Sequence, residues 1–209
     1  MQIALVPSIE TRSRDLESDA DSVAGGSTDR ALIKAIARAD REAMRLLFCR
    51  FKTPVYRFAR RLIADHNTAE DIVSDVFLDV WRRAGTFKGQ SSVSTWLLAI
   101  TRNKVMALLR RRAVEPLDDD AAERIEDDSD GPETVCQKQQ VRSILQASLK
   151  RLAPVHREII DLVYYHDRSI AEVAKILDIP TSTVKTRMFY ARERLAKMLR
   201  DTRQTELYG

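Results

Sequence analysis

The sequence of 209 residues predicts an all-α protein made of two small helical modules. Apolar residues recur every three or four positions along most of the chain, which is the spacing of amphipathic helices. No stretch shows the convincing alternation of apolar and polar side chains that is typical of a strand. Gly and Pro number only six each, which favours regular helices with few turns.

The charges are segregated along the chain, although the net charge is only +4. Residues 30–112 and 136–209 carry net charges of +11 and +6, whereas residues 1–29 and 113–135 carry −4 and −9. Two basic blocks separated by an acidic segment indicate two modules that meet polyanions. Because the ten carboxylates of the acidic segment repel one another, we expect it to be an extended tether.

These patterns divide the chain into five segments. We expect a disordered N-terminal tail at residues 1–28, a helical module at 29–112 and a flexible acidic linker at 113–135. A second helical module follows at 136–203, and a short C-terminal tail covers 204–209.

Several classes of protein are excluded. No apolar run approaches the roughly 18 residues of a membrane span, and the start of the chain lacks the basic region of a secretory signal. Cys49 and Cys136 lie far apart without a CxxC motif, which favours a reducing, cytoplasmic location over a disulfide framework. His66, His156 and His166 lack metal-ligand spacing, and no nucleophile has a recognisable base. We therefore predict a protein that is not an enzyme and has neither metal nor cofactor.

In the first module, cap signals mark where the helices begin. Asp40 is expected to cap one helix, which Pro54 restarts as its first residue. Asn67 and Glu70 have the spacing of a capping box that opens the next helix. A polar break at residues 85–92 precedes the last helix of the module.

The second module contains the pattern of a helix-turn-helix at residues 169–194. Ser169 and Glu172 form a capping box for a short helix. Ile179 lies in the turn, where it can fill the corner between the helices. Asp178 stands where this motif usually has Gly, and Asp tolerates the left-handed conformation that the turn requires.

The second helix of this motif, expected from Thr181 to about Arg200, presents polar, basic and aromatic side chains on its outer face. A helix N-terminus with hydroxyl groups suits phosphates, and Lys and Arg can read guanine edges in the major groove. A hairpin with a solvated basic face is the structural alternative. The expected DNA-reading residues are Thr181, Ser182, Thr183, Lys185, Thr186, Arg187, Phe189, Tyr190 and Arg192.

Motifs from both modules occur together in a recognisable order. They are Ala69-Glu70-Asp71, Phe87-x-Gly89, Ser92-x-Ser94-Thr95-Trp96-Leu97, Ile100-x-x-Asn103, the Ser169–Ala174 segment and Val184-Lys185-Thr186-Arg187. With this spacing the chain resembles the extracytoplasmic-function (ECF) sigma factors, the small promoter-recognition subunits of bacterial RNA polymerase. The resemblance covers about residues 30–112 and 136–200. It implies an alternative sigma factor that binds core polymerase, recognises the −10 and −35 elements and melts DNA to initiate transcription.

The resemblance implies polymerase contacts for one side of the helix that follows Asn67. Asp71, Asp75 and Asp79 step by four along it, and a basic protein partner would explain carboxylates within a basic block. A solvated acidic face is the alternative. The residues implied to bind the β′ clamp helices are Glu70, Asp71, Asp75, Phe77 and Asp79, while the second module would hold the β flap.

By the same resemblance, the polar loop before Trp96 holds a flipped base of the −10 element. Trp96 itself has two interpretations, a base contact or a core residue. Val93 and Ala107 depart from the family, which commonly has Phe or Tyr and Asp at these positions. The residues implied at the −10 element are Phe87, Lys88, Gly89, Gln90, Ser91, Ser92, Ser94, Trp96, Asn103, Arg110 and Arg111.

The resemblance also implies an anti-sigma factor that clamps both modules, and a linker that runs through the polymerase channel. A plain solubilising tether is the alternative for the linker. A free-standing helix-turn-helix regulator, dimeric on an operator, is the competing function. Such a regulator needs neither the serine-rich loop nor the carboxylate row.

Overall fold

The computed structural model describes residues 28–63, 65–114, 147–149 and 151–208. All regular structure in these residues is helical, which confirms the predicted fold class there. A helix at residues 28–36 comes first. It is followed by α2 (Arg41–Leu62), α3 (His66–Arg83), the 3₁₀ turn η1 (Ala84–Thr86), α4 (Val93–Val114), α6 (Pro154–Tyr164), α7 (Ile170–Leu177) and α8 (Thr181–Tyr208). The predictions for residues 1–27, for the linker at 115–135 and for residues 136–146 lie outside the described residues.

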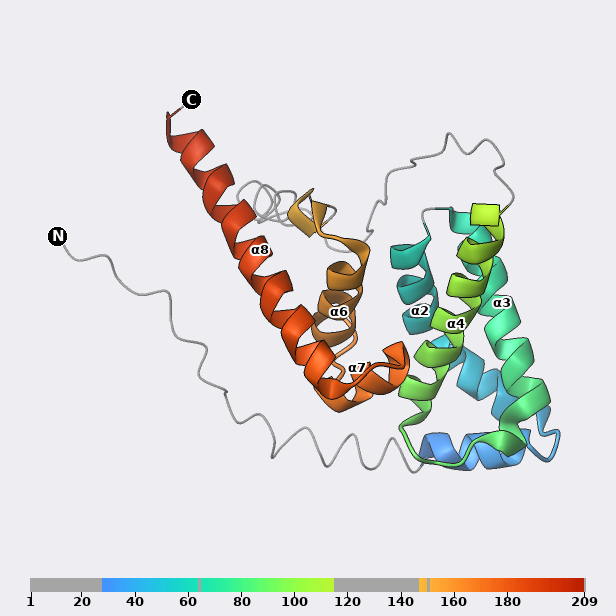
Figure 1. Cartoon of the computed structure of the whole chain (residues 1–209). Helices are drawn as coiled ribbons and strands as arrows, with labels where there is room; N and C mark the ends of the chain where they lie inside the picture. Colours follow the sequence, from blue (N-terminus) through green and yellow to red (C-terminus); the bar gives the residue numbers. More distant parts are fainter. Residues whose placement is uncertain (1–27, 64, 115–146, 150, 209) are drawn as a thin grey trace, which may run out of the picture.

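The first module is a bundle of α2, α3 and α4, with the helix of residues 28–36 lying across one end (Figure 1). Its core includes Leu47, Val76, Val80, Leu97 and Val105, all fully buried. These residues come from all three helices at helical spacing, so burying them fixes the bundle.

The prediction that Pro54 restarts a helix is wrong, because α2 is continuous from Arg41 to Leu62. Proline lacks a backbone N–H and disfavours a helix interior. Here Phe51, Val55 and Phe58 are buried on either side of it. Their burial outweighs the lost hydrogen bond and keeps the helix in one piece.

The caps of α2 and α3 differ in how well the sequence predicted them. Asp40 accepts two backbone N–H bonds at the start of α2, as expected. The prediction of a capping box at Asn67 and Glu70 is wrong, because α3 starts earlier and contains both residues. Asp65 is the cap and accepts from the Thr68 N–H at 2.7 Å. Hydrogen bonds from Thr68 hold the pKa of Asp65 below its usual value.

The first helix ends in a left-handed residue that is not glycine. Ala39 has φ +64°. Its N–H donates to the Ile36 carbonyl at 2.8 Å, and the Asp40 N–H donates to the Ala35 carbonyl at 3.2 Å. This is the Schellman pattern, in which glycine is the usual residue at the Ala39 position.

Replacing Ala39 by glycine is therefore expected to stabilise the protein by about 0.5–1 kcal/mol, because it removes the Cβ strain of the left-handed conformation. Urea unfolding followed by circular dichroism measures the change. As a control, Ala107→Gly in the middle of α4 should destabilise by about 1 kcal/mol. A loss of stability in Ala39→Gly would contradict the expectation.

The second module packs α6, α7 and α8 around a separate set of buried residues. Ile159, Leu162, Val173, Val184 and Ala191 are fully buried in it. The long α8 lies beside α6, and α7 crosses near its N-terminal end (Figure 1). Helix α8 extends to Tyr208, past the predicted end near Arg200.

The helix-turn-helix prediction is confirmed in its details. Ser169 and Glu172 form the complete capping box at the start of α7. Asp178 adopts the left-handed conformation with φ 52° and ψ 51°. Ile179 packs against the module's core from the turn.

Candidate nucleic-acid and polymerase interfaces

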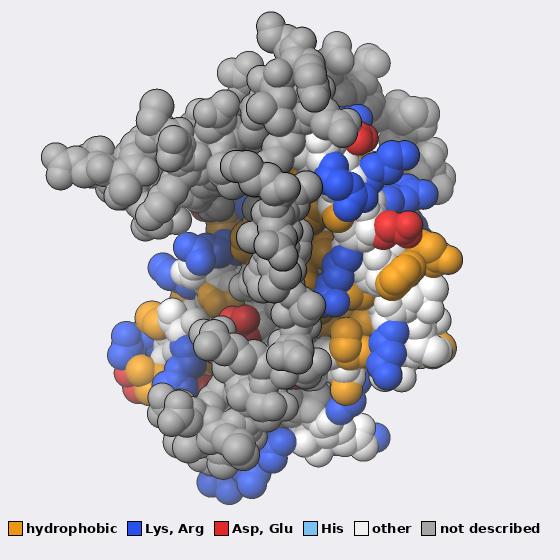
Figure 2. All heavy atoms as spheres, turned by 90° about the vertical axis from the view of Figure 1, so that its left-hand side faces the viewer, with side chains coloured by type: hydrophobic (Ala, Val, Ile, Leu, Met, Phe, Trp, Pro, Cys, Tyr) orange, Lys and Arg blue, Asp and Glu red, His pale blue; other side chains and the backbone are white. Residues whose placement is uncertain are grey.

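The outer face of α8 carries the residues predicted to read DNA. The Phe189 and Tyr190 side chains are 64% and 50% exposed. Thr183 and Arg187 are half-buried. Also exposed on this helix are Thr181, Ser182, Lys185, Thr186 and Arg192. Figure 2 views the side of the molecule on which α8 lies and shows Lys and Arg side chains there beside hydrophobic ones.

The buried side of α8 sets the orientation of the exposed outer face. Val184, Met188 and Ala191 are buried against the rest of the module. Arg192 is also held, because its Nε donates to the Tyr164 hydroxyl at 3.0 Å. Tyr164, for which no role was predicted from the sequence, comes from the last turn of α6 and is 53% exposed.

The electrostatics near α8 agree with a cationic surface. His156 lies on α6, and burial lowers its pKa. The positive charges of Arg194 and Arg187 lower this pKa further. The positive potential that opposes a charged imidazole also attracts phosphates.

The loop after η1 forms a basic pocket with the first helix. The Arg30 guanidinium donates to the Gly89 carbonyl at 3.2 Å, and Gly89 has φ +68°. A pocket of about 480 Å³ is lined by Arg30, Lys34, Arg38 and Lys88. Of these four residues, only Lys88 was predicted from the sequence. The signal for the others was their spacing of four residues, which begins on the helix of residues 28–36 and continues into the turn that follows it.

A second pocket brings Trp96 and Asn103 together. It measures about 330 Å³, and Thr86 and Ala107 also line it. Trp96 is half-buried, and its ring centroid lies 5.0 Å from that of Phe87. Trp96 therefore packs on the core and also borders a pocket with an amide group.

The remaining residues predicted at the −10 element do not all gather at these pockets. Ser92 accepts the Thr95 N–H at 3.1 Å at the start of α4. Ser91 and Ser94 are half-buried, and Gln90 is exposed. Arg110 is exposed and lies about 24 Å beyond Ser94 along α4, because a helix rises 1.5 Å per residue. Arg111, next to it, is exposed as well.

The acidic row on α3 is only partly free. Glu70, Asp71 and Asp75 are exposed. Lys104 of α4 is paired with two members of the row, because its Nζ lies 3.0 Å from the Asp79 carboxylate and 3.8 Å from that of Asp75. Asp79 therefore contributes to helix packing as well as to the row.

Two neighbouring apolar residues of α3 differ in exposure from what the sequence indicated. Phe77 is 3% exposed, and its ring meets that of Phe48 edge to face at 4.8 Å. Phe77 therefore packs in the core beneath the acidic row and is not itself available to a partner. Leu78, for which no role was predicted, is 43% exposed; it directly precedes Asp79 and follows Asp75 by three positions.

Within the described residues, no group of three or more His, Cys, Asp or Glu side chains is placed to hold a metal ion. None of the described helices has the length and apolar character needed to cross a membrane.

Family models match both modules. Residues 47–114 match Sigma-70 region 2, and residues 148–197 match Sigma-70, region 4. Together the two matches cover more than half of the chain and correspond to the bundle and to the helix-turn-helix module, respectively.

Curated relatives and solved structures agree with these matches. The chain is 29% identical over 178 residues to the ECF RNA polymerase sigma factor SigW of Bacillus subtilis, covering 81% of this chain and 95% of SigW. It is 27% identical over 180 residues to the RNA polymerase sigma-H factor of Pseudomonas aeruginosa, covering 82% and 93%. A solved structure of the sigma factor RpoE with the anti-sigma factor NepR from Bartonella quintana aligns with a TM-score of 0.59 and 27% identity, over 75% of this chain and 96% of that one.

The order of the two modules, the confirmed helix-turn-helix and these matches lead to one conclusion. The chain belongs to the sigma-70 family as an ECF-type sigma factor, a non-catalytic, DNA-binding protein that directs transcription initiation by RNA polymerase.

Proposed function

We propose that this sigma factor divides promoter recognition between two surfaces. The outer face of α8 reads the −35 duplex, and the region around residues 87–96 with Asn103 holds the melted −10 strand. The observation that carries the proposal is the pocket where Trp96 and Asn103 meet. An aromatic ring and an amide beside basic side chains suit an unstacked base and its phosphates.

We assign the basic pocket of Arg30, Lys34, Arg38 and Lys88 to the phosphates of the same strand. Four cations around one cavity favour a polyanion. This pocket and the Trp96 pocket both involve the segment from Ala84 to Phe87 and its flanks, so one single strand can reach both.

The proposed polymerase contact is the exposed part of α3, with Glu70, Asp71 and Asp75 around Leu78. Carboxylates beside an exposed apolar side chain suit a basic protein partner. The β′ clamp helices are the proposed partner here, and the β flap is the partner of the second module. Because bacterial core polymerase acts in the cytoplasm, the proposed function implies that this sigma factor acts there too.

The relative from Bartonella quintana was solved with an anti-sigma factor. We propose that this chain too is held inactive by an anti-sigma factor that contacts both modules. Co-purification of the full chain with proteins encoded beside it tests this assignment.

Run-off transcription tests the whole proposal. Purified core polymerase, the full chain and a promoter library should yield transcripts that depend on the chain. Transcripts that do not depend on it, together with tight binding of the chain alone to a palindrome, would overturn the proposal.

Asn103→Ala is expected to slow promoter opening by roughly 5- to 150-fold, since one base contact is worth about 1–3 kcal/mol. Permanganate footprinting of the melted strand measures opening. Asn67→Ala, an exposed asparagine on α3, serves as the control. A premelted promoter should restore activity to Asn103→Ala, and failure to do so would indicate damage elsewhere.

A further inference from the structure

The pocket that contains Trp96 and Asn103 also holds an ion pair to which the proposed function gives no role. Asp79 of α3 and Lys104 of α4 both line this pocket, and a carboxylate oxygen of Asp79 lies 3.0 Å from Lys104 Nζ. Among the described residues that line the pocket, Asp79 is the only acid. The sequence predicted a polymerase contact for Asp79, whereas its position on the pocket wall places it at the proposed −10 site.

Both members of the pair are accessible and keep hydrogen-bonding capacity. The Asp79 and Lys104 side chains are 25% and 22% exposed. A base in the pocket can therefore reach them, and hydrogen bonds made there are stronger than in open water. Their mutual contact uses only one of the roughly four acceptor positions of a carboxylate, and the ammonium keeps further donors. The pair thus offers an acceptor group and a donor group side by side.

The other walls of the pocket complete a site for a planar polar ligand. The cavity of about 330 Å³ is at the small end of ligand pockets, which suits a single base. Trp96 and Ile100 give it apolar surface. Asn103 precedes the lysine on α4, so its amide adds a donor and an acceptor beside the ammonium. Arg83, one turn beyond the carboxylate on α3, adds a cation for a phosphate.

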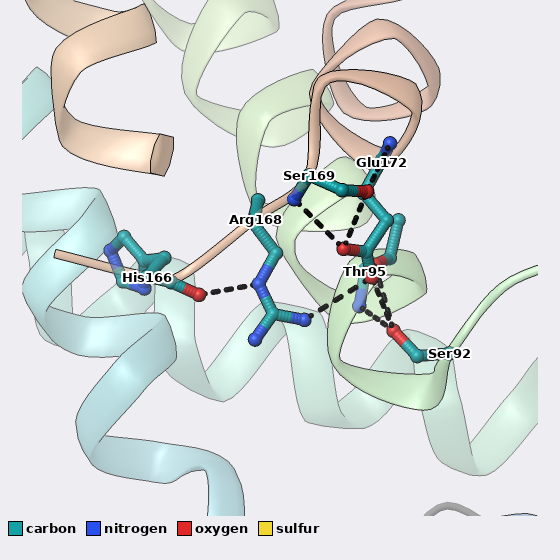
Figure 3. A network of polar contacts seen from close by, with 6 residues as sticks. All are labelled: Ser92, Thr95, His166, Arg168, Ser169 and Glu172. Atoms are coloured by element: carbon teal, nitrogen blue, oxygen red, sulfur yellow. Dashed lines mark hydrogen bonds and ion pairs between the residues drawn. The ribbon is translucent and has the colours of Figure 1, made fainter. Parts of the chain in front are cut away.

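The helix that carries most of these residues is held at its first turn by the polar network in Figure 3. Ser92 accepts the Thr95 N–H at 3.1 Å. The Thr95 hydroxyl donates at 2.6 Å to Oε1 of Glu172, which belongs to α7 of the second module. Oε2 of the same carboxylate accepts the Ser169 N–H at 3.0 Å. Trp96 directly follows Thr95, so the pocket begins where α4 is fixed.

Guanine is the base whose Watson–Crick edge matches the ion pair. This edge presents the acceptor O6 next to two donors, N1–H and the N2 amino group. One carboxylate can accept both donors, while the neighbouring ammonium donates to O6 and an amide donates to N7. A base that has been taken out of the stack is read through this edge.

The other bases fit the arrangement less completely. Cytosine and adenine each place a single amino group beside a ring nitrogen that accepts, so the carboxylate gains one hydrogen bond instead of two. Thymine has its N3–H between two carbonyl oxygens, and both oxygens would face the carboxylate. A partly buried acceptor that loses its donor weakens binding, so the pocket discriminates against all three.

We propose that Asp79 and Lys104 are specificity-determining residues that select guanine at one position of the melted −10 strand. The inference rests on the function proposed above for this pocket and adds which base the pocket takes. Asp79 accepts from N1–H and the N2 amino group, Lys104 donates to O6, and Arg83 contacts the phosphate of the same nucleotide. The polymerase contact keeps the other carboxylates of the α3 row.

A promoter library tests this assignment in the holoenzyme. Core polymerase and the full chain transcribe templates that carry all four bases at each −10 position, and a barcode in the transcript identifies its template. We expect one position at which guanine is favoured. Asp79→Asn should reduce that preference by roughly 5- to 150-fold, the discrimination that one bidentate base contact provides. Lys104→Met, which removes the donor to O6, should reduce the preference as well.

Asp75→Asn is the matched control. It removes the other carboxylate near Lys104, one turn before Asp79 on α3, and Asp75 is not among the described residues that line the pocket. This variant should keep the parent's preference at every −10 position, even where a weaker polymerase contact lowers the total transcript. If Asp79 only braced α3 against α4, Asp79→Asn would lower transcription from all templates equally.

A base analogue tests the same contact without changing the protein, so it decides the case even if Asp79→Asn fails to fold. Hypoxanthine in place of the favoured guanine lacks only the N2 amino group. On a premelted promoter the parent should lose transcription severalfold with hypoxanthine, the effect of one lost hydrogen bond. Asp79→Asn should distinguish little between the two bases.

The results separate the choice of base from the proposed site. Guanine selection is overturned if Asn103→Ala slows promoter opening while the parent favours another base or none. It is also overturned if Asp79→Asn keeps the guanine preference, or if the parent accepts hypoxanthine as well as guanine. If Asn103→Ala leaves opening unchanged, this pocket does not hold the −10 strand, and the proposed function fails together with the inference.

Discussion

Replacing Phe58 by alanine is expected to lower the free energy of unfolding by about 3–5 kcal/mol, the usual cost of emptying a buried phenylalanine site. Phe58 is fully buried in the core of the second module although it belongs to α2 of the first. The cavity would therefore lie where the modules meet. Urea unfolding followed by circular dichroism measures the loss.

The matched control is Phe48→Ala, since Phe48 lies on the same helix but is 37% exposed. Its loss should be no more than about 1–2 kcal/mol, because little apolar area leaves the core. The cost of Phe58→Ala should also shrink in an Arg102→Glu background, because that change breaks the 2.7 Å ion pair between Arg102 of α4 and Glu158 of α6 in the same interface. Equal costs in both backgrounds would show that Phe58 stabilises the first module alone.

Lys185→Ala and Tyr190→Ala are each expected to reduce transcription from promoters with a −35 element by roughly 5- to 150-fold, from about 1–3 kcal/mol per contact. Both side chains are exposed on the outer face of α8, and the Tyr190 ring contacts that of Phe189 on the same face. Run-off transcription on templates with single-base changes at −35 gives both the loss and the change in base preference.

Lys197→Ala is the control for this pair, because Lys197 is exposed on α8 three turns beyond Lys185. It should keep the parent's preference at −35. If neither Lys185→Ala nor Tyr190→Ala alters that preference, the reading face lies elsewhere on the second module. A uniform loss on all templates from Lys185→Ala would instead assign Lys185 to a phosphate.

The helix-turn-helix was predictable because its signals are local. The Ser169 capping box, the left-handed Asp178 and the four-and-three spacing of Val184, Met188 and Ala191 each depend on residues a few positions apart. Such signals are written into the sequence itself. The same local reasoning failed at Pro54, where tertiary burial of Phe51 and Val55 overrides the propensity of one residue.

The contacts between the modules could not be predicted in this way. The Thr95 hydroxyl donates to Glu172 at 2.6 Å from a position 77 residues away in the sequence. Arg102 donates to Glu158 at 2.7 Å, and these two residues are 56 apart. Each is an ordinary polar residue on its own helix. Glu172 was correctly assigned to the cap, but nothing nearby in the sequence indicates that its second oxygen binds another module. The basic row of the first helix was, by contrast, visible in its spacing and was overlooked.

The contact between the two modules joins parts of a single chain, and this lowers the strength that the interface needs. About thirty residues connect α4, which ends at Val114, to the helical residues that begin at 147. A connection of that kind gives each module a local concentration of the other on the order of millimolar. An interface too weak to hold two separate fragments together would therefore still hold the two tethered modules in contact. Doubling the length of the connection would cost only about 0.6 kcal/mol, so the contact depends little on that length.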